Sequence, residues 1–105
     1  MLFKPTKVSE VPFRATRDGA ASYFIGGSIA EDKGFAINGG VSPWTKVVFD
    51  NHNTIFGADT ATAMGEYYFT DSDATVTKVE YTFQYKKVGD AMKIVVHHSS
   101  IPYAP

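Results

Sequence analysis

The sequence predicts an α+β domain in which one short helix lies over a curved antiparallel sheet. Two observations favour this class: the second half alternates between apolar and polar residues, and the first half contains one helix-like segment that ends at two glycines. A chain of 105 residues can form one hydrophobic core but not two. We therefore expect a single domain over residues 1–105, with any functional site built on it.

The first half is predicted to hold one strand, one helix and a long loop. The opening MLFKPTKV has the pattern of a strand. In TRDGAASYFIGG, apolar residues recur at three- and four-residue spacing, Thr16 can serve as N-cap, and Gly26 and Gly27 can end a helix. The segment SIAEDKGFAINGGVSP has two apolar islands among Gly, Asp and Pro, which is typical of a loop with at most one short turn of regular structure.

The second half is predicted to form four strands. KVEYTFQYKK alternates strictly, as expected for a strand with one solvated face. ATAMGEYYFTDSD precedes it, and DSDA provides a polar turn between the two. WTKVVFDNHNTIFGAD and KIVVHHSS supply the outer two strands, the latter reached through the turn VGDAM. Strands joined by such short turns form an antiparallel meander.

Composition excludes several functional classes. Ten Lys and Arg against eleven Asp and Glu give a net charge of −1, and these charges are scattered, so we expect neither nucleic acid nor a membrane as partner. The absence of cysteine excludes disulfides, thiolate metal sites and thiol nucleophiles. No apolar run has the length of a membrane span.

The N-terminus predicts a truncated domain. MLFKPTKV has the pattern of a strand that is already under way at the first residue. A sheet with this many aromatic residues also needs more cover than one short helix gives. We therefore expect that a preceding helical segment is missing.

The terminal strand carries the clearest candidates for chemistry, the successive residues His97, His98, Ser99 and Ser100. Side chains alternate along a strand, so the four cannot form one cluster. Because Ile94 and Val96 make their face the more apolar one, we expect His98 and Ser100 to point into the fold. His97 and Ser99 are then expected to serve the outer face or support the strand end.

Neither a metal site nor a catalytic triad is favoured. Adjacent histidines on a strand point apart, and His52 lies in a different segment, so we expect no metal and no cofactor. A Ser/His/acid triad is not excluded, but the candidate acids have no motif around them and are expected to be solvated charges. These acids are Asp50, Asp59 and Glu66.

The tyrosines fall into two groups. Four lie on predicted strands, where tyrosine is ordinarily a core or interface residue; they are Tyr67, Tyr68, Tyr81 and Tyr85. Tyr23 lies on the one helix, which must face the sheet. Its hydroxyl can therefore point into the same cavity as His98 and Ser100.

Five segments together carry a family resemblance: LFKPT, GAASYF, AMGEYYFT, KVEYTFQYKK and KIVVHHSSIP. Their succession resembles the proteins similar to the association domain of calcium/calmodulin-dependent protein kinase II. Within that group the sequence looks like the iota-class carbonic anhydrases, whose terminal signature is HHSS followed, after one residue, by Pro. HHSSIP matches this signature from His97 to Pro102, and the resemblance spans Leu2 to Tyr103.

The resemblance implies a cone-shaped fold of the nuclear transport factor 2 superfamily, with a helical segment before the first strand that we expect to be missing here. It also implies hydration of carbon dioxide to bicarbonate without a metal, although manganese has been proposed for some algal members. Carried over by motif, the site residues are Thr6, Tyr23, His98 and Ser100. A chloroplast or bacterial cell-envelope location follows from the resemblance alone.

In the mechanism expected from this resemblance, Thr6, Tyr23 and Ser100 bind the oxygens of carbon dioxide or bicarbonate, and His98 orients water or relays its proton. The expected apolar wall consists of Phe24, Phe83 and Val96. An alternative is a noncatalytic association module that forms a homodimer through an exposed sheet face carrying Tyr67 and Phe69. A small-molecule isomerase or cyclase is a third reading, by fold analogy alone.

Overall fold

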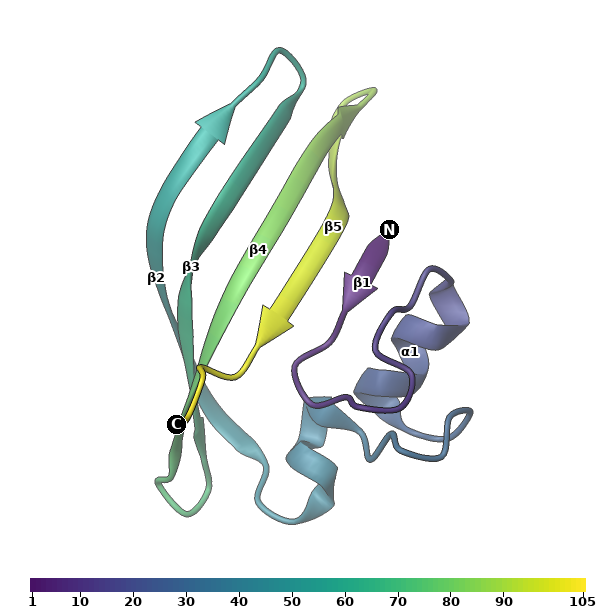
Figure 1. The fold of residues 1–105 in the computed structure, drawn as a ribbon, viewed down its shortest axis with the longest axis vertical. Helices are drawn as coiled ribbons and strands as arrows, with labels where there is room; N and C mark the ends of the chain where they lie inside the picture. Colours follow the sequence, from purple (N-terminus) through teal and green to yellow (C-terminus); the bar gives the residue numbers. More distant parts are fainter.

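In the computed structural model, which describes residues 1–105, a five-stranded sheet is flanked by one α-helix and one 3₁₀ helix (Figure 1). The strands are β1 (Leu2–Lys4), β2 (Trp44–Phe56), β3 (Thr60–Asp71), β4 (Val76–Val88) and β5 (Ala91–Ser100), and the helices are α1 (Arg17–Ile25) and η1 (Phe35–Gly40). The strand order is β1-β5-β4-β3-β2. Strand β1 pairs in parallel with β5, and all other pairs are antiparallel. The predicted α+β class and four-stranded meander are confirmed.

Helix α1 begins and ends where the sequence predicts. The side chain of Thr16 accepts a hydrogen bond from the backbone N–H of Gly19, which satisfies one of the free amides of the first turn. Gly26 ends the helix with a φ of 82°, a left-handed value that glycine adopts without strain. The helix packs its Tyr23 and Phe24 towards the ring of Phe3 on β1.

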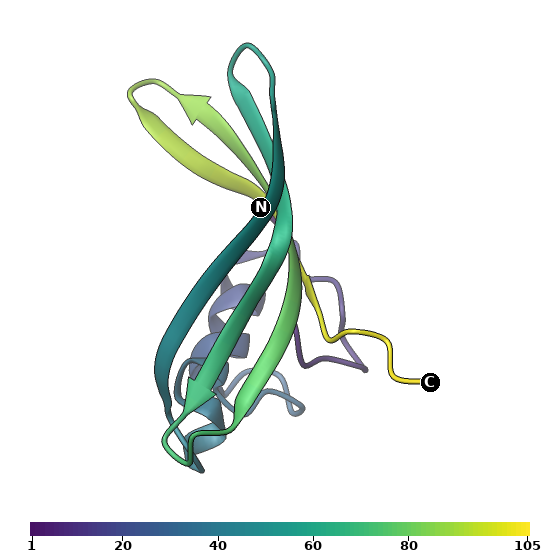
Figure 2. The ribbon, with the colours of Figure 1, turned by 90° about the vertical axis from the view of Figure 1, so that its left-hand side faces the viewer.

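The sheet is strongly twisted and bent, as Figure 2 shows. Strand β2 has an irregularity between Asn51 and Asn53, where His52 is an extra residue relative to β3. Gly65 lies opposite this bulge, and a Cβ built on it would lie 2.5 Å from the carbonyl oxygen of Asp50. Glycine is therefore required there because the two backbones approach too closely for any side chain.

The face of the sheet that packs against the helices is called the inner face here, and the opposite one the outer face. A cluster of four buried residues on the inner face forms the core: Tyr67, Val79, Tyr81 and Phe83. The ends of the β2–β3 and β4–β5 hairpins extend beyond the helices (Figure 1), and Phe56 at one of these ends is 79% exposed. One helix thus covers only part of the inner face.

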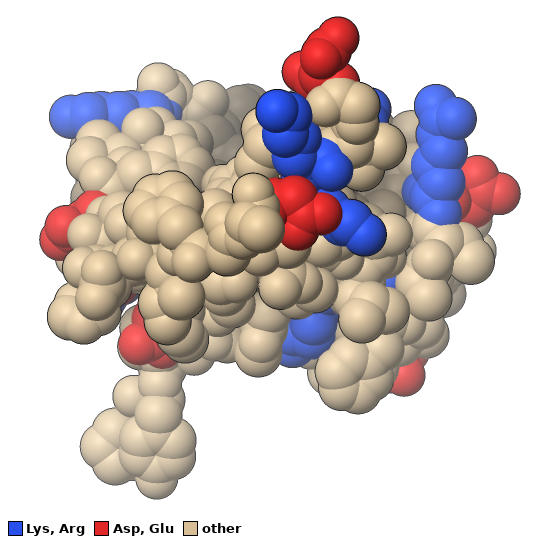
Figure 3. Space-filling view, turned by 90° about the horizontal axis from the view of Figure 1, so that it is seen from above, with Lys and Arg blue, Asp and Glu red and all other residues tan.

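Charged side chains of both signs are interspersed on the surface, and Figure 3 shows one such face without a patch of a single sign. This agrees with the scattered charges in the sequence. No helix combines the length and the apolar character that crossing a bilayer requires.

Candidate active site

The candidate active site is a cavity of about 360 Å³ between the inner face and the helices. Of its thirteen lining residues ten are apolar, and they include Phe24 and Phe83 of the expected wall. Val96, the third expected wall residue, lines a separate groove at β1 instead. The other three lining residues of the cavity are Thr6, His97 and Ser99, and two of the ten, Tyr23 and Tyr67, add hydroxyl groups to the lining. A small number of polar groups in an apolar pocket is typical of a site for a small ligand.

Strand β5 presents His97 and Ser99 to this cavity, not His98 and Ser100. Ser99 is 1% exposed, and the ring of His97 lies 4.8 Å from that of Phe3 and 4.4 Å from that of Phe83, between ring centres. The expected placement of His98 and Ser100 inside the fold is wrong. The assignment of His97 and Ser99 to the outer face is wrong for the same reason.

A bulge in β5 explains why His97 and Ser99 face the cavity in place of His98 and Ser100. Gln84 pairs with Val96, whereas the next residue, Tyr85, pairs with Ile94, so β5 has one extra residue at Val95. One extra residue moves every side chain after it to the opposite face. Ile94 does share the inner face with Tyr85, as its apolar character suggested, but the alternation does not continue from it to His98.

Tyr67 joins the two inward-facing polar residues of β5. Its hydroxyl forms a hydrogen bond with Oγ of Ser99 and lies 3.4 Å from Nε2 of His97. The same Nε2 lies 3.1 Å from Oγ of Ser99, so the three groups form a closed triangle. The alternative of an association module placed Tyr67 and Phe69 on an exposed sheet face; that placement is wrong, because both line the cavity. The strict alternation of the neighbouring strand, which pairs Val79 with Tyr67, was the available signal.

Thr6 and Tyr23 lie where they were expected, in the wall that faces β5. Both are buried, and the hydroxyl of Tyr23 accepts a hydrogen bond of 3.0 Å from the backbone N–H of Lys7. Burial raises the pKa of Tyr23 to about 12, while the Lys7 amide and the Thr6 hydroxyl act in the opposite direction. The phenol is therefore neutral at physiological pH and can donate a hydrogen bond into the cavity.

The ionisation of the triangle is also set by burial. Burial raises the pKa of Tyr67, and the hydroxyls of Ser99 and Thr6 offset part of that shift. Burial, assisted by the neighbouring His98, lowers the pKa of His97 from 6.5 to about 4. At neutral pH the site thus holds neutral phenols and a neutral imidazole whose free nitrogen can accept a proton.

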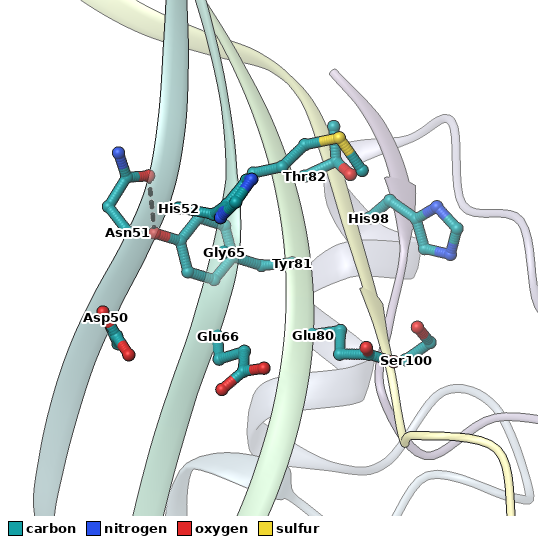
Figure 4. A pocket seen from close by; sticks show the side chains of 11 residues that line it. Asp50, Asn51, His52, Gly65, Glu66, Glu80, Tyr81, Thr82, His98 and Ser100 are labelled. Carbon is teal, nitrogen blue, oxygen red and sulfur yellow. Dashed lines mark hydrogen bonds between the residues drawn. The ribbon is translucent and has the colours of Figure 1, made fainter.

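His98 and Ser100 lie on the outer face, in a groove of about 620 Å³ (Figure 4). Other polar side chains that line this groove are Asp50, His52, Glu66 and Glu80. Glu66 is engaged by the hydroxyl of Tyr68 at 2.6 Å and by the amine of Lys78 at 3.2 Å. No group of three or more histidine, aspartate or glutamate side chains is arranged to hold a metal ion. Asp59, the remaining candidate acid, lines neither the groove nor the cavity.

Comparison with known proteins gives concordant matches. The family model of metal-independent carbonic anhydrases matches residues 1–101. A metal-independent carbonic anhydrase from Nostoc sp. (strain PCC 7120) is 43% identical over 107 residues, which cover 98% of this chain and 50% of that protein. The chain thus spans about half the length of the curated relative it matches.

Two solved structures are similar. A cyanobacterial iota-carbonic anhydrase, crystallised in complex with bicarbonate, is 42% identical and superposes with a TM-score of 0.89, covering 99% of this chain and 63% of that one. A putative calcium/calmodulin-dependent protein kinase type II association domain from Thiobacillus denitrificans is 21% identical, with a TM-score of 0.54 over 62% of this chain and 52% of that one, and shows the fold alone. The resemblance seen in the sequence is confirmed: the chain belongs to the metal-independent carbonic anhydrase family.

Proposed function

We propose that the chain catalyses the reversible hydration of carbon dioxide to bicarbonate in the inner cavity, using its own polar groups and no metal. The observation that carries this proposal is the convergence of Thr6, Tyr23, His97 and Ser99 on one mostly apolar cavity. Carbon dioxide is small and apolar and suits such walls, whereas bicarbonate needs the hydrogen-bond donors. The family's name and the bicarbonate complex of a relative support the same chemistry.

The hydroxyls act on the oxygens of the substrate. When the oxygen of water attacks the carbon, a C–O bond forms and one C=O electron pair moves onto a substrate oxygen. Thr6, Tyr23 and Ser99 donate hydrogen bonds to the oxygens on which this charge develops. Donors held in place in a poorly hydrated pocket stabilise such charge more than bulk water does.

His97 and Tyr67 handle the proton that the water loses. The Nε2 atom of His97 lies 3.4 Å from the hydroxyl of Tyr67, so this hydroxyl can take up the proton of the water while it passes its own proton to the imidazole. The hydroxyl of Ser99 then remains a donor to the substrate. The low pKa of His97 keeps the imidazole unprotonated at neutral pH and makes the imidazolium give up its proton readily to buffer.

The test is stopped-flow hydration of carbon dioxide by chelator-treated protein, comparing Ser99→Ala with Ser100→Ala. Activity should fall by at least about tenfold in Ser99→Ala, because a donor to the developing charge is lost, and stay near wild type in Ser100→Ala. Absence of activity in the wild-type chain, or equal loss in the two variants, would contradict the proposal.

A homodimer through the sheet is a separate proposal. It draws support from exposed apolar side chains on the outer face, including Val48 and Met64, which lie beside the polar groove. Sedimentation equilibrium should give the mass of two chains. A single-chain mass at tens of micromolar would rule the dimer out.

A further inference from the structure

The most deeply buried ion pair of the molecule lies outside the cavity, behind Tyr23. Arg14 is 3% exposed and Asp32 8%, and two nitrogens of the guanidinium donate to the two carboxylate oxygens, each at 2.8 Å. Ser22, 2% exposed, donates to the same carboxylate at 2.6 Å. We call Arg14, Asp32 and Ser22 the clamp. Because burying such a pair costs desolvation energy, its presence is weak evidence for a role in stability.

The clamp joins segments on both sides of α1. Besides Asp32, Arg14 donates to the carbonyl oxygens of Val11 and Gly19, each at 2.9 Å. The hydroxyl of Ser22 accepts the backbone N–H of Ile29 at 3.1 Å. The loop before α1, the first turn of α1 and the loop after it are thereby fixed to one buried point.

Two walls of the active site are attached to this point. Tyr23 follows Ser22 on α1, and its ring centre lies 5.9 Å from the guanidinium carbon of Arg14. Thr6 lies in the loop between β1 and Arg14, whose backbone exchanges two hydrogen bonds with Phe3, of 3.1 and 2.7 Å. The N–H of Lys7, next to Thr6, donates to the hydroxyl of Tyr23.

The carboxylate of Glu31, next to Asp32 in the chain, holds the same loop from outside. It accepts hydrogen bonds from three successive backbone N–H groups, those of Ser9, Glu10 and Val11. The loop that carries Thr6 is therefore restrained at its middle by Glu31 and at its end by Arg14. Its freedom to move Thr6 relative to Ser99 is small.

We infer that the clamp is a positioning device that fixes the hydroxyls of Tyr23 and Thr6 relative to the hydroxyl of Ser99 on the opposite side of the cavity. This inference rests on the proposed function, because a fixed distance between these hydroxyls is needed only if one substrate binds to both sides of the cavity. Displacement of a binding group by about 1 Å can lower a rate about 100-fold. None of the clamp residues touches the cavity, so they act through the two hydroxyls.

The test replaces the ion pair by apolar side chains in the double variant Arg14→Met/Asp32→Leu. Such replacements often leave stability unchanged or raised, which separates positioning from folding. The bicarbonate dissociation constant, from ¹³C NMR titration, should rise at least about tenfold, and kcat/KM for hydration should fall by a similar factor. The matched control removes the exposed pair of the outer face, Lys78→Met/Glu66→Leu, and should change neither quantity more than about twofold.

Two further measurements test whether the clamp affects bicarbonate binding through Tyr23 and the loop that carries Thr6. In a Tyr23→Phe background, removal of the clamp should weaken bicarbonate binding by a clearly smaller factor, because part of the effect passes through that hydroxyl. The amide of Lys7 should also lose hydrogen-exchange protection in the clamp variant, a result that does not depend on catalysis.

A folded double variant with wild-type bicarbonate affinity and wild-type Lys7 protection would overturn the inference. If the double variant does not fold, Ser22→Ala decides in the same way, since it removes only one hydroxyl and leaves the ion pair. A wild-type chain without hydration activity would instead refute the proposed function, and Lys7 protection would still report on the clamp.

Discussion

Tyr67 connects Ser99 on β5 to His97, the proposed proton acceptor. It is the residue whose hydroxyl contacts both Ser99 and His97, and its burial keeps the phenol neutral. Without it, the hydroxyl of Ser99 would lose one of its two side-chain partners and keep only Nε2 of His97. A residue expected only to serve the core or an interface thus also contributes a hydroxyl to the inner cavity.

Tyr67→Phe tests this role at the scale of one hydroxyl. We expect kcat/KM for hydration to fall at least about tenfold, because the orientation of Ser99 and one route to His97 are lost together. The free energy of unfolding should fall by only about 1 kcal/mol, the usual contribution of one hydrogen bond. Tyr85→Phe, which removes a hydroxyl from the same face beyond the cavity, is the control; equal rates for the two variants would contradict the role of Tyr67.

The pH dependence of the rate follows from the lowered pKa of His97. An ordinary imidazole would lose its ability to accept a proton below pH 6.5, whereas His97 retains it down to about pH 4. Hydration activity should therefore persist through pH 6 and decline only as the pH approaches 4. A rate profile with a midpoint near 6.5 would show that His97 is not buried as described.

The same shift makes the stability depend on pH in a defined direction. Between pH 6.5 and about 4 the unfolded chain binds a proton at His97 that the folded chain does not, so stability falls as the pH is lowered through this range. After allowance for partial exposure the contribution is on the order of 2 kcal/mol. Urea unfolding at pH 7.5 and pH 5 should show a smaller loss for His97→Asn than for the wild type; identical losses would argue against the shift.

Two bulges set the geometry of the sheet at the scale of elements. The bulge at His52 in β2 lies opposite Gly65, and the bulge at Val95 in β5 decides which half of the HHSS sequence faces the cavity. The strands, the helix and its Thr16 cap were predictable because each depends on local patterns. The bulge in β5 was not, because KIVVHHSS contains no glycine or other residue that marks an inserted position.

The site was predictable to the same extent. Thr6 and Tyr23 both line the cavity, as expected. Thr6 was carried over from the family motif, and Tyr23 lies on the helix that must face the sheet. To predict which two residues of HHSS face the cavity, one must know which side chains of β5 point inward, and a single inserted residue reverses this alternation. Arg14 and Asp32 could not be identified, because their pairing joins loops that are distant in the sequence.

Gly65→Ala tests the first bulge. The added Cβ would lie 2.5 Å from the carbonyl oxygen of Asp50 and 2.8 Å from backbone atoms of Asn51 and His52, so the strands must separate. We expect a loss of about 1–3 kcal/mol in the free energy of unfolding, measured by urea denaturation. Met64→Ala, a neighbouring change on the exposed outer face, should cost much less; comparable values for the two would mean that the strands are not so close.

At the scale of the whole molecule, the main structural feature is the small number of residues that are buried from solvent. Only 15 of 105 residues are buried, and Phe49 and Phe56 remain largely exposed on the inner face. They line a second apolar cavity of about 380 Å³ towards the hairpin ends. The candidate site nevertheless lies in the part of the sheet that α1 and η1 do cover, so its two walls are both present in this chain.

Bicarbonate is proposed to bind on the inner face, between the two walls of the cavity, and not at His98 and Ser100 on the outer face. A crystal structure of this chain soaked with bicarbonate tests it most directly. We predict the ion in the inner cavity, within hydrogen-bond distance of the hydroxyls of Thr6, Tyr23 and Ser99. Bicarbonate bound in the outer groove at His98 and Ser100, with the inner cavity free of it, would contradict the account.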